Sequence, residues 1–312
     1  MNSLLRIVFF GTPEFAVPSL RALLAGRDPV IGVVCQPDKP AGRGQHLAVP
    51  PVKQAAVDAG LPVFQPEKLR APETLETLAS WSPDLIVVAA YGKILPKIVL
   101  DLPPLGCINV HASLLPKYRG AAPIQWAIWR GEERTGVTIM RMNEGMDTGD
   151  ILLRHEIDIG PNETSGELQG RLAELGARVL TEAIAGLHTG TLLAQQQREE
   201  EMTLAPMIKK ADGHIDWTHP AVHLARMVRA FNPWPSAYTR LGGKQLNIHR
   251  AHADAGGGAA PPGTVVTINR GFSVATGKGV LVLEEVQLEG RKRLAAAEFA
   301  RGAVKVGTVL GE

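Results

Sequence analysis

Short apolar segments recur along the first two thirds of the chain and are bounded by glycine or proline. They are RIVFF (6–10), VIGVVC (30–35), DLIVVAA (84–90), GCINV (106–110) and GVTIMRM (136–142). Apolar runs of this length without polar alternation are typical of strands that are buried on both faces, as in a parallel sheet covered by helices. This pattern restricts the fold more than any other feature of the sequence.

Helical stretches separate these segments. Residues 18–26 and 51–60 each end in glycine, the usual helix stop, and residues 73–81 form a third stretch before the third apolar run. The alternation predicts an α/β fold with an open, mostly parallel, Rossmann-like sheet. In such sheets, ligands bind beyond the carboxyl ends of the strands, near the point where the strand order reverses.

A longer helix is predicted from Thr164 onward. Thr164 and Glu167 have the spacing of a capping box, and apolar residues then recur at helical spacing up to Gly190. Residues 191–213 are polar, charged in blocks and without a sustained period, which is typical of an interdomain linker. We therefore expect a linker at about 190–210, between two domains.

The last third of the chain changes character. After one predicted helix at 220–231, polar-apolar alternating runs flank Gly242 and Gly243, and further short apolar runs follow with glycine turns. This spacing predicts antiparallel strands joined by hairpins. We expect an α/β domain over residues 1–205, followed by a smaller C-terminal OB-like β-barrel domain over 206–312. OB barrels often bind oligonucleotides, although a fold alone does not determine function.

Charge is divided unevenly between these domains. Residues 1–207 hold 19 Lys and Arg against 23 Asp and Glu, a net −4, whereas residues 208–312 hold 14 against 8, a net +6. Lys and Arg on one face gain affinity for a polyanion by displacing its counterions, so the asymmetry suggests a nucleic acid partner. A solvated basic face without a partner is the alternative that charge alone leaves open.

Composition excludes several classes of protein. The chain has 312 residues, 45% hydrophobic and 21% charged, so it can bury a full core and we expect a soluble globular protein. Its opening apolar run is too short for a signal peptide, and no run is long enough to span a membrane, so we expect a cytoplasmic protein. Cys35 and Cys107 lie far apart in strand-like segments, which predicts buried free thiols instead of a disulfide framework or a zinc site.

Three polar residues, Asn109, His111 and Ser113, alternate along the fourth apolar segment and just beyond it. Alternate side chains of a strand face the same way, so Asn109 and His111 should emerge together near the C-terminal end of the strand. An amide and an imidazole can both donate hydrogen bonds to an oxygen that becomes negative during acyl transfer, which is the role of an oxyanion hole. The alternative is a strand-end asparagine in a turn and a histidine whose ring is satisfied within the fold.

Two aspartates follow the fifth apolar segment, in the stretch NEGMDTGDI (143–151). Asp147 and Asp150 lie there among Gly145 and Gly149, which allow the loop backbone to take positive φ. Aspartate is also a common turn former, so the stretch alone is a weak sign of a site. A carboxylate beside a histidine, however, would fix the orientation of the ring and let it hold or deliver a proton near neutral pH.

Motifs for common nucleotide and metal sites are absent from the sequence. GTPEF follows the first apolar segment instead of GxGxxG, and neither a P-loop motif nor HExxH occurs. The stretch CQPDKPAGRGQ (35–45) follows the second apolar segment and carries Lys39, Arg43 and two glycines. Such a loop can move and contact phosphate, or it can be a mobile surface loop without a ligand.

Several longer stretches closely resemble the methionyl-tRNA formyltransferase family, over nearly all 312 residues. They are FGTPEFAVPSL, QPDKPAGRGQ, NVHASLLPKYRGAAPIQWAI, TGVTIMRMNEGMDTGDIL and, in the second domain, IDW. The resemblance implies an enzyme that transfers a formyl group from 10-formyltetrahydrofolate to the α-amino group of methionine carried on initiator tRNA. It also implies that the α/β domain binds folate and catalyses, that the OB-like domain holds tRNA, and that no metal is required.

The family's functional residues fall on matching positions of this sequence. By resemblance, Asn109, His111 and Asp147 are catalytic. The implied folate contacts are Ser113, Leu114, Leu115 and Pro116, and the implied tRNA contacts are Arg43 in the mobile loop and Lys209 and Lys210 in the linker. The linker is less basic than is usual for the family, since REEEM precedes these two lysines. Leu114 and Leu115 could equally be core residues.

Two other functions stay open at this point. The same folate chemistry could act on a small amine, such as a nucleotide sugar or a purine precursor, with a purely structural second domain. Alternatively, the chain could be an RNA-binding protein without catalysis. The basic second domain argues against the former, and the retained Asn109, His111 and Asp147 argue against the latter. We expect a monomer.

Overall fold

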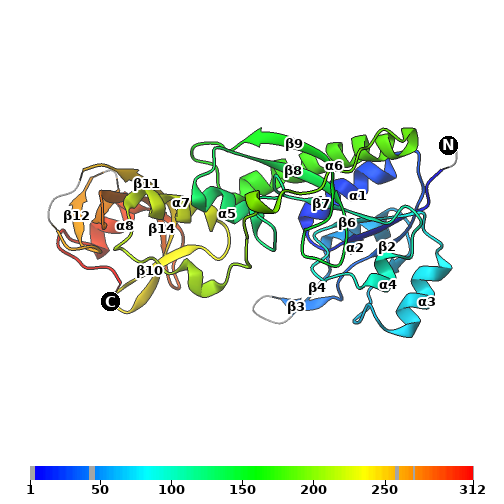
Figure 1. Ribbon diagram of the computed structural model, residues 1–312. Coiled ribbons are helices and arrows are strands. Elements are labelled where there is room, and N and C mark those ends of the chain that lie inside the picture. The colour runs from blue at the N-terminus through cyan, green and yellow to red at the C-terminus, as the bar shows by residue number, and fades with distance from the viewer. Residues whose placement is uncertain (1–3, 42–45, 257–259, 270, 312) are drawn as a thin grey trace. The chain divides into compact units, whose positions relative to one another are not determined.

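The computed structural model describes residues 4–41, 46–256, 260–269 and 271–311 of the chain (Figure 1). The chain divides into two compact units. The first comprises Met1–Pro123, Arg134–Asp158 and Gln169–Ala205, and the second comprises Ile124–Glu133, Ile159–Leu168 and Pro206–Glu312. Two short segments within the first 205 residues therefore belong to the second unit.

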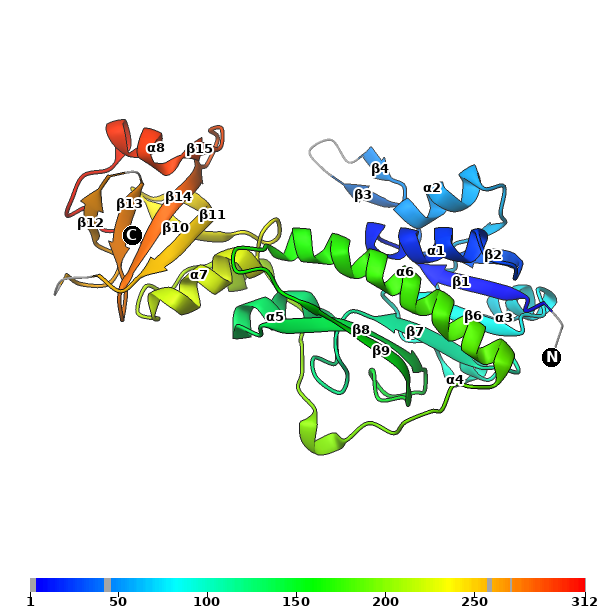
Figure 2. The ribbon, with the colours of Figure 1, turned by 90° about the horizontal axis from the view of Figure 1, so that it is seen from above.

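A seven-stranded sheet forms the centre of the first unit (Figure 2). Its strands are β1 (Ile7–Gly11), β2 (Val30–Val34), β5 (Val63–Phe64), β6 (Leu85–Ala89), β7 (Cys107–His111), β8 (Arg134–Arg141) and β9 (Ile151–Asp158), in the spatial order β5-β2-β1-β6-β7-β8-β9. The pairs from β5 to β7 are parallel, and β8 and β9 extend the sheet antiparallel. The predicted mostly parallel sheet is confirmed, and its strand order reverses between β1 and β6.

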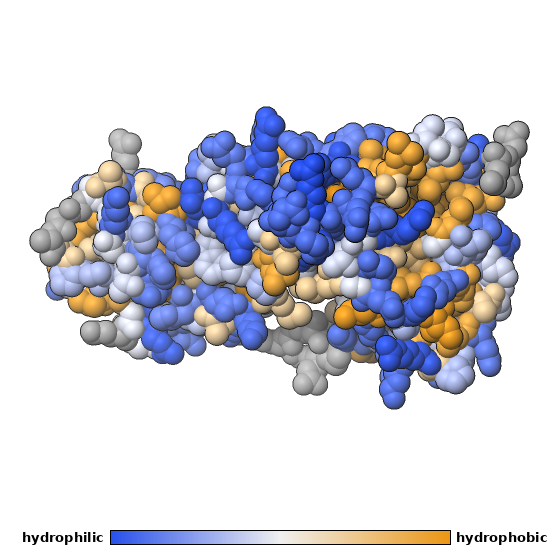
Figure 3. All heavy atoms as spheres, viewed as in Figure 1, coloured by the Kyte–Doolittle hydropathy of each residue, from blue (hydrophilic) through white to orange (hydrophobic). Residues whose placement is uncertain are grey.

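The sequence does not predict β5 and β9, for different reasons. β5 has only two residues, too few for any period to show. β9 alternates half-buried residues with the exposed Arg154, Glu156 and Asp158, and Arg134 of β8 forms ion pairs with Glu156 and Asp158. Hydrophilic side chains gather over this edge of the unit (Figure 3). Charges of this kind protect an edge strand from pairing with another chain.

Helices cover both faces of this sheet. They are α1 (Val17–Leu24), α2 (Pro51–Asp58), α3 (Pro72–Ser80), α4 (Lys97–Leu100) and α6 (Ser165–Thr189), with a short η1 (Glu14–Ala16) before α1 and a small hairpin of β3 (Lys39–Ala41) and β4 (His46–Ala48). Leu78 of α3 and Val99 of α4 belong to a core on one face. On the opposite face, a Cβ added to Gly176 of α6 would lie 2.8 Å from the side chain of Val110. Glycine thus lets α6 lie close against β7.

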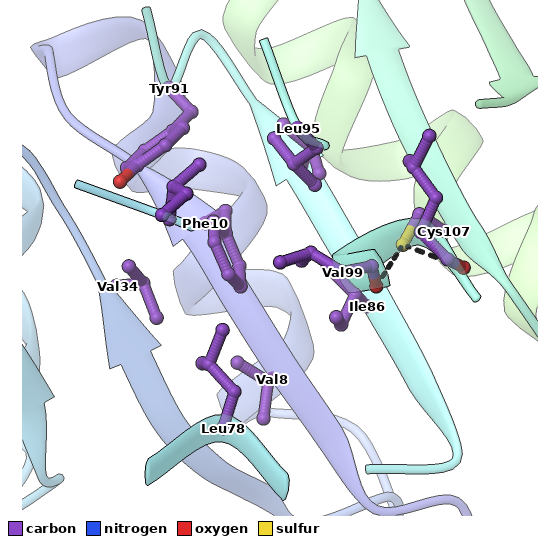
Figure 4. Packing of buried hydrophobic residues seen from close by; sticks show 12 residues of the cluster. Val8, Phe10, Val34, Leu78, Ile86, Tyr91, Leu95, Val99 and Cys107 are labelled. Atoms are coloured by element: carbon purple, nitrogen blue, oxygen red, sulfur yellow. Dashed lines mark hydrogen bonds between the residues drawn. The ribbon is translucent and has the colours of Figure 1, made fainter. Parts of the chain in front are cut away.

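Aromatic and branched side chains fill the core between α3, α4 and the sheet (Figure 4). Val8 and Phe10 of β1 point into it together, because residues two apart in a strand share a face. The rings of Phe10 and Tyr91 meet edge to face, with centroids 5.1 Å apart. Burying each such side chain fully stabilises the fold by about 1.5–3 kcal/mol.

Helix α6 begins as the sequence predicts. The Thr164 backbone N–H donates to Glu167 Oε2 at 2.8 Å, and the Glu167 N–H donates to Thr164 Oγ1 at 3.3 Å, which completes the capping box. The helix ends before Gly190, whose φ of +68° favours glycine. Among the described residues, no helix combines the length and apolar character that crossing a membrane requires.

The second unit is built on an antiparallel sheet. Its strands are β10 (Ala237–Leu241), β11 (Lys244–Asp254), β12 (Val265–Ile268), β13 (Phe272–Ala275), β14 (Val280–Leu288) and β15 (Leu294–Ala295). The helices α5 (Pro123–Arg130), η3 (Lys210–Gly213) and α7 (Ala221–Ala230) precede these strands in the chain, and α8 (Ala296–Ala303) follows them. Gly242 and Gly243, at φ +54° and +75°, form the two-residue turn between β10 and β11, as a tight hairpin of this type requires. The predicted second domain of antiparallel strands is confirmed.

The segment that the sequence marks as a linker lies against the first unit. Gln195 pairs with Ile151 of β9, and Leu204 pairs with Arg119, on either side of a short η2 (Glu199–Glu201). The backbone is therefore held by the first unit as far as Ala205, whose N–H donates to the Arg119 carbonyl at 2.8 Å.

Both cysteines are buried in the first unit, and we expect them to be unreactive in the folded protein. Burial raises the pKa of the Cys35 thiol to about 11 and that of the Cys107 thiol to about 12. A raised pKa leaves less thiolate at pH 8, so a disulfide reagent should react at least about 100-fold more slowly with the native protein than with a free cysteine. Reagent kinetics before and after unfolding in guanidinium check this. Rapid modification of either thiol in the native state would contradict it.

Candidate active site

The polar side chains of β7 lie on the sheet face opposite α6. Val110 points toward α6, so Asn109 and His111, which alternate with it, point the other way. Across the strand pair, Asn109 lies opposite Met140 and His111 lies opposite Thr138 of β8. The amide and the imidazole therefore share one face near the end of β7.

The Asn109 carboxamide is half-buried and uncommitted. Within the part of the chain that the structure describes, its side chain makes no hydrogen bond, although most polar groups in such surroundings have a partner. A carboxamide carries two N–H donors and one acceptor oxygen. Asn109 can thus donate to a bound molecule without first breaking a contact within the protein.

The two nitrogens of the His111 ring have different surroundings. Its Nε2 lies 3.0 Å from the carbonyl oxygen of Tyr118, and the side chain is buried. A carbonyl oxygen can only accept, so Nε2 must carry a proton. The exchangeable position is therefore Nδ1, which lies 3.6 Å from Asp147 Oδ2. A proton at Nδ1 would make the ring an imidazolium beside a carboxylate.

A closed loop carries Asp147 to this position. The Arg141 N–H donates to the Asp150 carbonyl at the base of the loop, and Asn143 Oδ1 accepts from Gly145 N–H at 3.0 Å. Asp147 itself has a φ of +55°, and its Oδ2 accepts the Gly120 N–H at 2.8 Å. The carboxylate is thus fixed from a second segment of the chain.

Two hydroxyl groups, those of Thr138 and Ser113, hold the turn after β7. Thr138 Oγ1 donates to the Ser113 carbonyl at 2.7 Å and accepts the Leu115 N–H at 3.1 Å. The Ser113 hydroxyl donates to the Lys117 carbonyl at 2.6 Å, and the Ser113 residue is fully buried. The four residues for which the sequence implies folate contacts therefore form a rigid turn on the same face as His111.

Side chains of this turn have different surroundings. Leu115 is buried in a cluster with Met140 and Ile151, whereas Leu114 is only half-buried. Pro116 borders a cavity of about 190 Å³ whose other walls are Ile151, Arg154, residues 195–198 and Glu201. None of Asn109, His111 and Asp147 lines this cavity.

The basic residues expected to contact nucleic acid are only partly covered by the structure. Arg43 lies outside the described residues. Lys209 and Lys210 belong to the second unit and are exposed at the beginning of η3, where the Lys209 N–H donates to Asp212 Oδ2 at 2.7 Å. Their exposure leaves both side chains accessible to a phosphate group.

Sequence reasoning misses the groups that hold His111 and Asp147. These are the carbonyl of Tyr118 and the N–H of Gly120, which are backbone atoms and leave no pattern of residue types. The described residues contain no cluster of three or more His, Cys, Asp or Glu side chains able to hold a metal ion.

Comparison with known proteins places the chain among formyl transferases. The model of the family described as "Formyl transferase" matches residues 5–184, and that of "Formyl transferase, C-terminal domain" matches residues 207–304. A protein from Desulfotalea psychrophila named methionyl-tRNA formyltransferase is 55% identical over 97% of this chain and 94% of its own length. A protein of the same name from Myxococcus xanthus is 53% identical over 95% of both chains.

Solved structures support the fold. A methionyl-tRNA formyltransferase from Clostridium thermocellum matches with a TM-score of 0.55 at 18% identity, over 81% of this chain and 96% of that one. HypX from Aquifex aeolicus, solved in complex with tetrahydrofolic acid, matches with a TM-score of 0.62 at 18% identity, over 97% of this chain and 48% of that one.

Gly149 permits the tight base of the loop that carries Asp147, and we expect Gly149→Ala to destabilise the protein. An added Cβ would lie 1.6 Å from the Arg141 carbonyl oxygen, so the backbone must shift. Such overpacking costs about 1–3 kcal/mol in the free energy of unfolding, measured by denaturant titration. The control is Gly170→Ala at an exposed position of α6, where an added Cβ would have no neighbour within 4 Å. That change should stabilise by up to about 1 kcal/mol. Equal effects of the two changes would refute the steric argument.

Proposed function

The chain belongs to the family of methionyl-tRNA formyltransferases, and we propose that it formylates the α-amino group of methionine carried on initiator tRNA. Enzymes of the formyl transferase family take the formyl group from a folate-derived donor. We take the donor to be 10-formyltetrahydrofolate. The product would serve translation initiation, which would place the protein in the cytoplasm, and we expect it to act as a monomer.

The Asn109 carboxamide, free of hydrogen bonds among the described residues and on the same face of β7 as the His111–Asp147 pair, is the observation that carries this proposal. When the methionine amine attacks the formyl carbon, the carbonyl oxygen becomes negative. Asn109 Nδ2–H and a protonated His111 Nδ1 are donors on one face of the sheet, as the stabilisation of such an oxyanion requires. The Asn109 amide has no partner among the described residues, and His111 Nδ1 faces Asp147 Oδ2 at 3.6 Å, beyond the length of a hydrogen bond.

Proton balance gives His111 and Asp147 a second task. The attacking amine must lose one proton, and the folate nitrogen must gain one as its bond to the formyl carbon breaks. Because Tyr118 occupies Nε2 and the oxyanion role requires the proton on Nδ1, the Asp147 carboxylate facing Nδ1 is the group of this pair that can accept a further proton. Asp147 would therefore take the proton of the amine, directly or through water, and the proton would return to the leaving nitrogen.

The folate would contact the turn of residues 113–116. A site for a small molecule is mostly apolar and largely preformed, and this turn is fixed by Thr138 before any ligand binds. The half-buried side chain of Leu114 and the ring of Pro116 are its apolar groups nearest to solvent or to a cavity. Leu115 and Ser113 support the turn from inside.

Asn109→Ala should lower kcat by about 10²–10³-fold, because the loss of one oxyanion donor raises the barrier by about 2.7–4 kcal/mol. The measurement is formylation of methionyl initiator tRNA with 10-formyltetrahydrofolate. Asn162→Ala, the same change at an exposed turn, is the control and should leave kcat unchanged. A wild-type protein without formylated product would end the proposal, whereas an active Asn109→Ala variant would refute only the role given to Asn109.

Formylation of methionyl-tRNA should depend steeply on salt. Residues 208–312 carry a net +6, from 14 Lys and Arg against 8 Asp and Glu. Each phosphate neutralised releases a counterion, so KM for methionyl-tRNA should rise by at least about tenfold between 50 and 200 mM KCl. The KM for folate, measured in parallel, serves as the control. A salt-independent KM for methionyl-tRNA, or equal activity on free methionine, would favour a small amine as the acceptor.

A further inference from the structure

The segment after α6 passes along the catalytic side of the first unit and is anchored at both ends. We name residues 195–205 the strap. At its beginning, Gln195 and Ile151 exchange two backbone hydrogen bonds of 2.8 Å, and at its end Ala205 N–H donates to the Arg119 carbonyl. The family models match residues 5–184 and 207–304, so the strap lies between the two matched regions.

Three consecutive residues connect the strap to the catalytic side chains. The N–H groups of Tyr118 and Arg119 donate to the hydroxyl and carbonyl oxygens of Thr203, each at 2.9 Å. The Tyr118 carbonyl holds His111 Nε2, and the Gly120 N–H holds Asp147 Oδ2. The two backbone groups that bind the His111 ring and the Asp147 carboxylate thus belong to a turn that the strap itself holds.

Gln197 of the strap contacts the loop of Asp147 directly. It is buried, and its Nε2 donates to the carbonyl oxygens of Asp147 and Gly149 at 2.8 and 2.7 Å. Its Oε1 accepts from Arg119 Nε and Nη2 at 3.0 and 2.8 Å. Two carbonyls accept and a guanidinium donates, so only one orientation of the amide satisfies all four contacts.

Arg119 makes this arrangement hard to replace. Its guanidinium is buried and also binds the carboxylate of Glu199 at 2.7 and 3.0 Å. Its bond lowers the pKa of the Glu199 carboxyl, in agreement with a charge pair. A buried guanidinium has five donors and no acceptor, so Gln197 must turn its oxygen to Arg119 and its nitrogen to the loop.

We propose that Gln197, oriented by Arg119, is a positioning residue that sets the place of the Asp147 carboxylate relative to His111. The inference rests on the proposed function, in which Asp147 belongs to the pair of side chains that holds the proton. Asp147 has a left-handed backbone conformation that ordinary residues rarely adopt, and Gln197 fixes the carbonyl of that same residue. The strap therefore belongs to the active site and is not a passive connection.

One substitution separates positioning from packing. Gln197→Glu keeps the size of the side chain and an oxygen for Arg119, but it replaces both Nε2 donors by an acceptor facing the carbonyls of Asp147 and Gly149. If Gln197 serves only to attach the strap through Arg119, Gln197→Glu will behave as wild type. If it positions the loop, the carboxylate of Asp147 will move. A shift of about 1 Å can lower the rate of a catalytic step by about 10²-fold.

The test compares kcat and KM of Gln197→Glu and Gln197→Met in full-length protein with those of Gln196→Glu and Gln196→Met. Gln196 is the exposed neighbour and makes no hydrogen bond among the described residues. We expect kcat to fall by about 100-fold for both Gln197 variants, with each KM within about threefold of wild type and both Gln196 variants unchanged. Hydrogen exchange at the Gly120 amide, which donates to Asp147, is a second readout that needs no activity.

The outcomes are distinct. Wild-type kcat in Gln197→Glu, or unchanged protection of the Gly120 amide in both Gln197 variants, overturns the positioning role and leaves the proposed function standing. Should Gln197→Glu fail to fold, the neutral Gln197→Met decides in the same way. If the wild type formylated no tRNA, the proposed function would fail, but faster exchange at Gly120 in the Gln197 variants alone would still show that Gln197 fixes Asp147.

Discussion

The hydrogen bond from His111 Nε2 to the Tyr118 carbonyl determines what the rest of the site can do. A carbonyl oxygen cannot donate, so this one contact selects the tautomer and leaves Nδ1 as the position where a proton can come and go. It also turns Nδ1 toward Asp147. Without it, the ring could present either nitrogen, and the aspartate alone, at 3.6 Å, is too distant to choose between them.

The antiparallel strand β8 explains how the aspartate comes to face this nitrogen. Arg141, near the end of β8, lies opposite Ile108, whereas His111 lies opposite Thr138. The chain therefore leaves β8 beside the beginning of β7, and the loop of Asp147 must fold back over the strand to reach the histidine at its end. The closed base at Arg141 and Asp150, together with the Gly120 amide, makes that return possible. A parallel β8 would have ended on the same side as His111 and needed no such loop.

Sequence patterns predict the parts of this architecture that are determined locally. Both-face burial reveals β1, β2, β6, β7 and β8, and the spacing of Thr164 and Glu167 reveals the beginning of α6. The same reasoning offers Asn109, His111 and two loop aspartates as candidates, because amide, imidazole and carboxylate are groups that acyl transfer uses, and the family resemblance selects Asp147 from the two. It does not find Gln197, which stands in the run QQQREEE and shares its composition with a solvated linker. Gln197 differs from Gln196 in its contacts to Asp147 and Arg119, which lie some fifty and eighty positions earlier in the chain.

The strap holds two residues whose backbone conformation is strained. Tyr118 and Asp147 are both in left-handed conformations, at φ +63° and +55°, and each such non-glycine residue costs about 1–3 kcal/mol. An isolated turn or loop would relax, and the His111 and Asp147 side chains would then sample many separations. Thr203 holds the N–H of Tyr118, and Gln197 holds the carbonyl of Asp147, so a single segment opposes relaxation at both strained residues. Hydrogen bonds in the protein interior exceed their exposed counterparts in strength, and Gln197 is buried. A site assembled from three segments far apart in sequence can therefore keep its geometry before any substrate arrives.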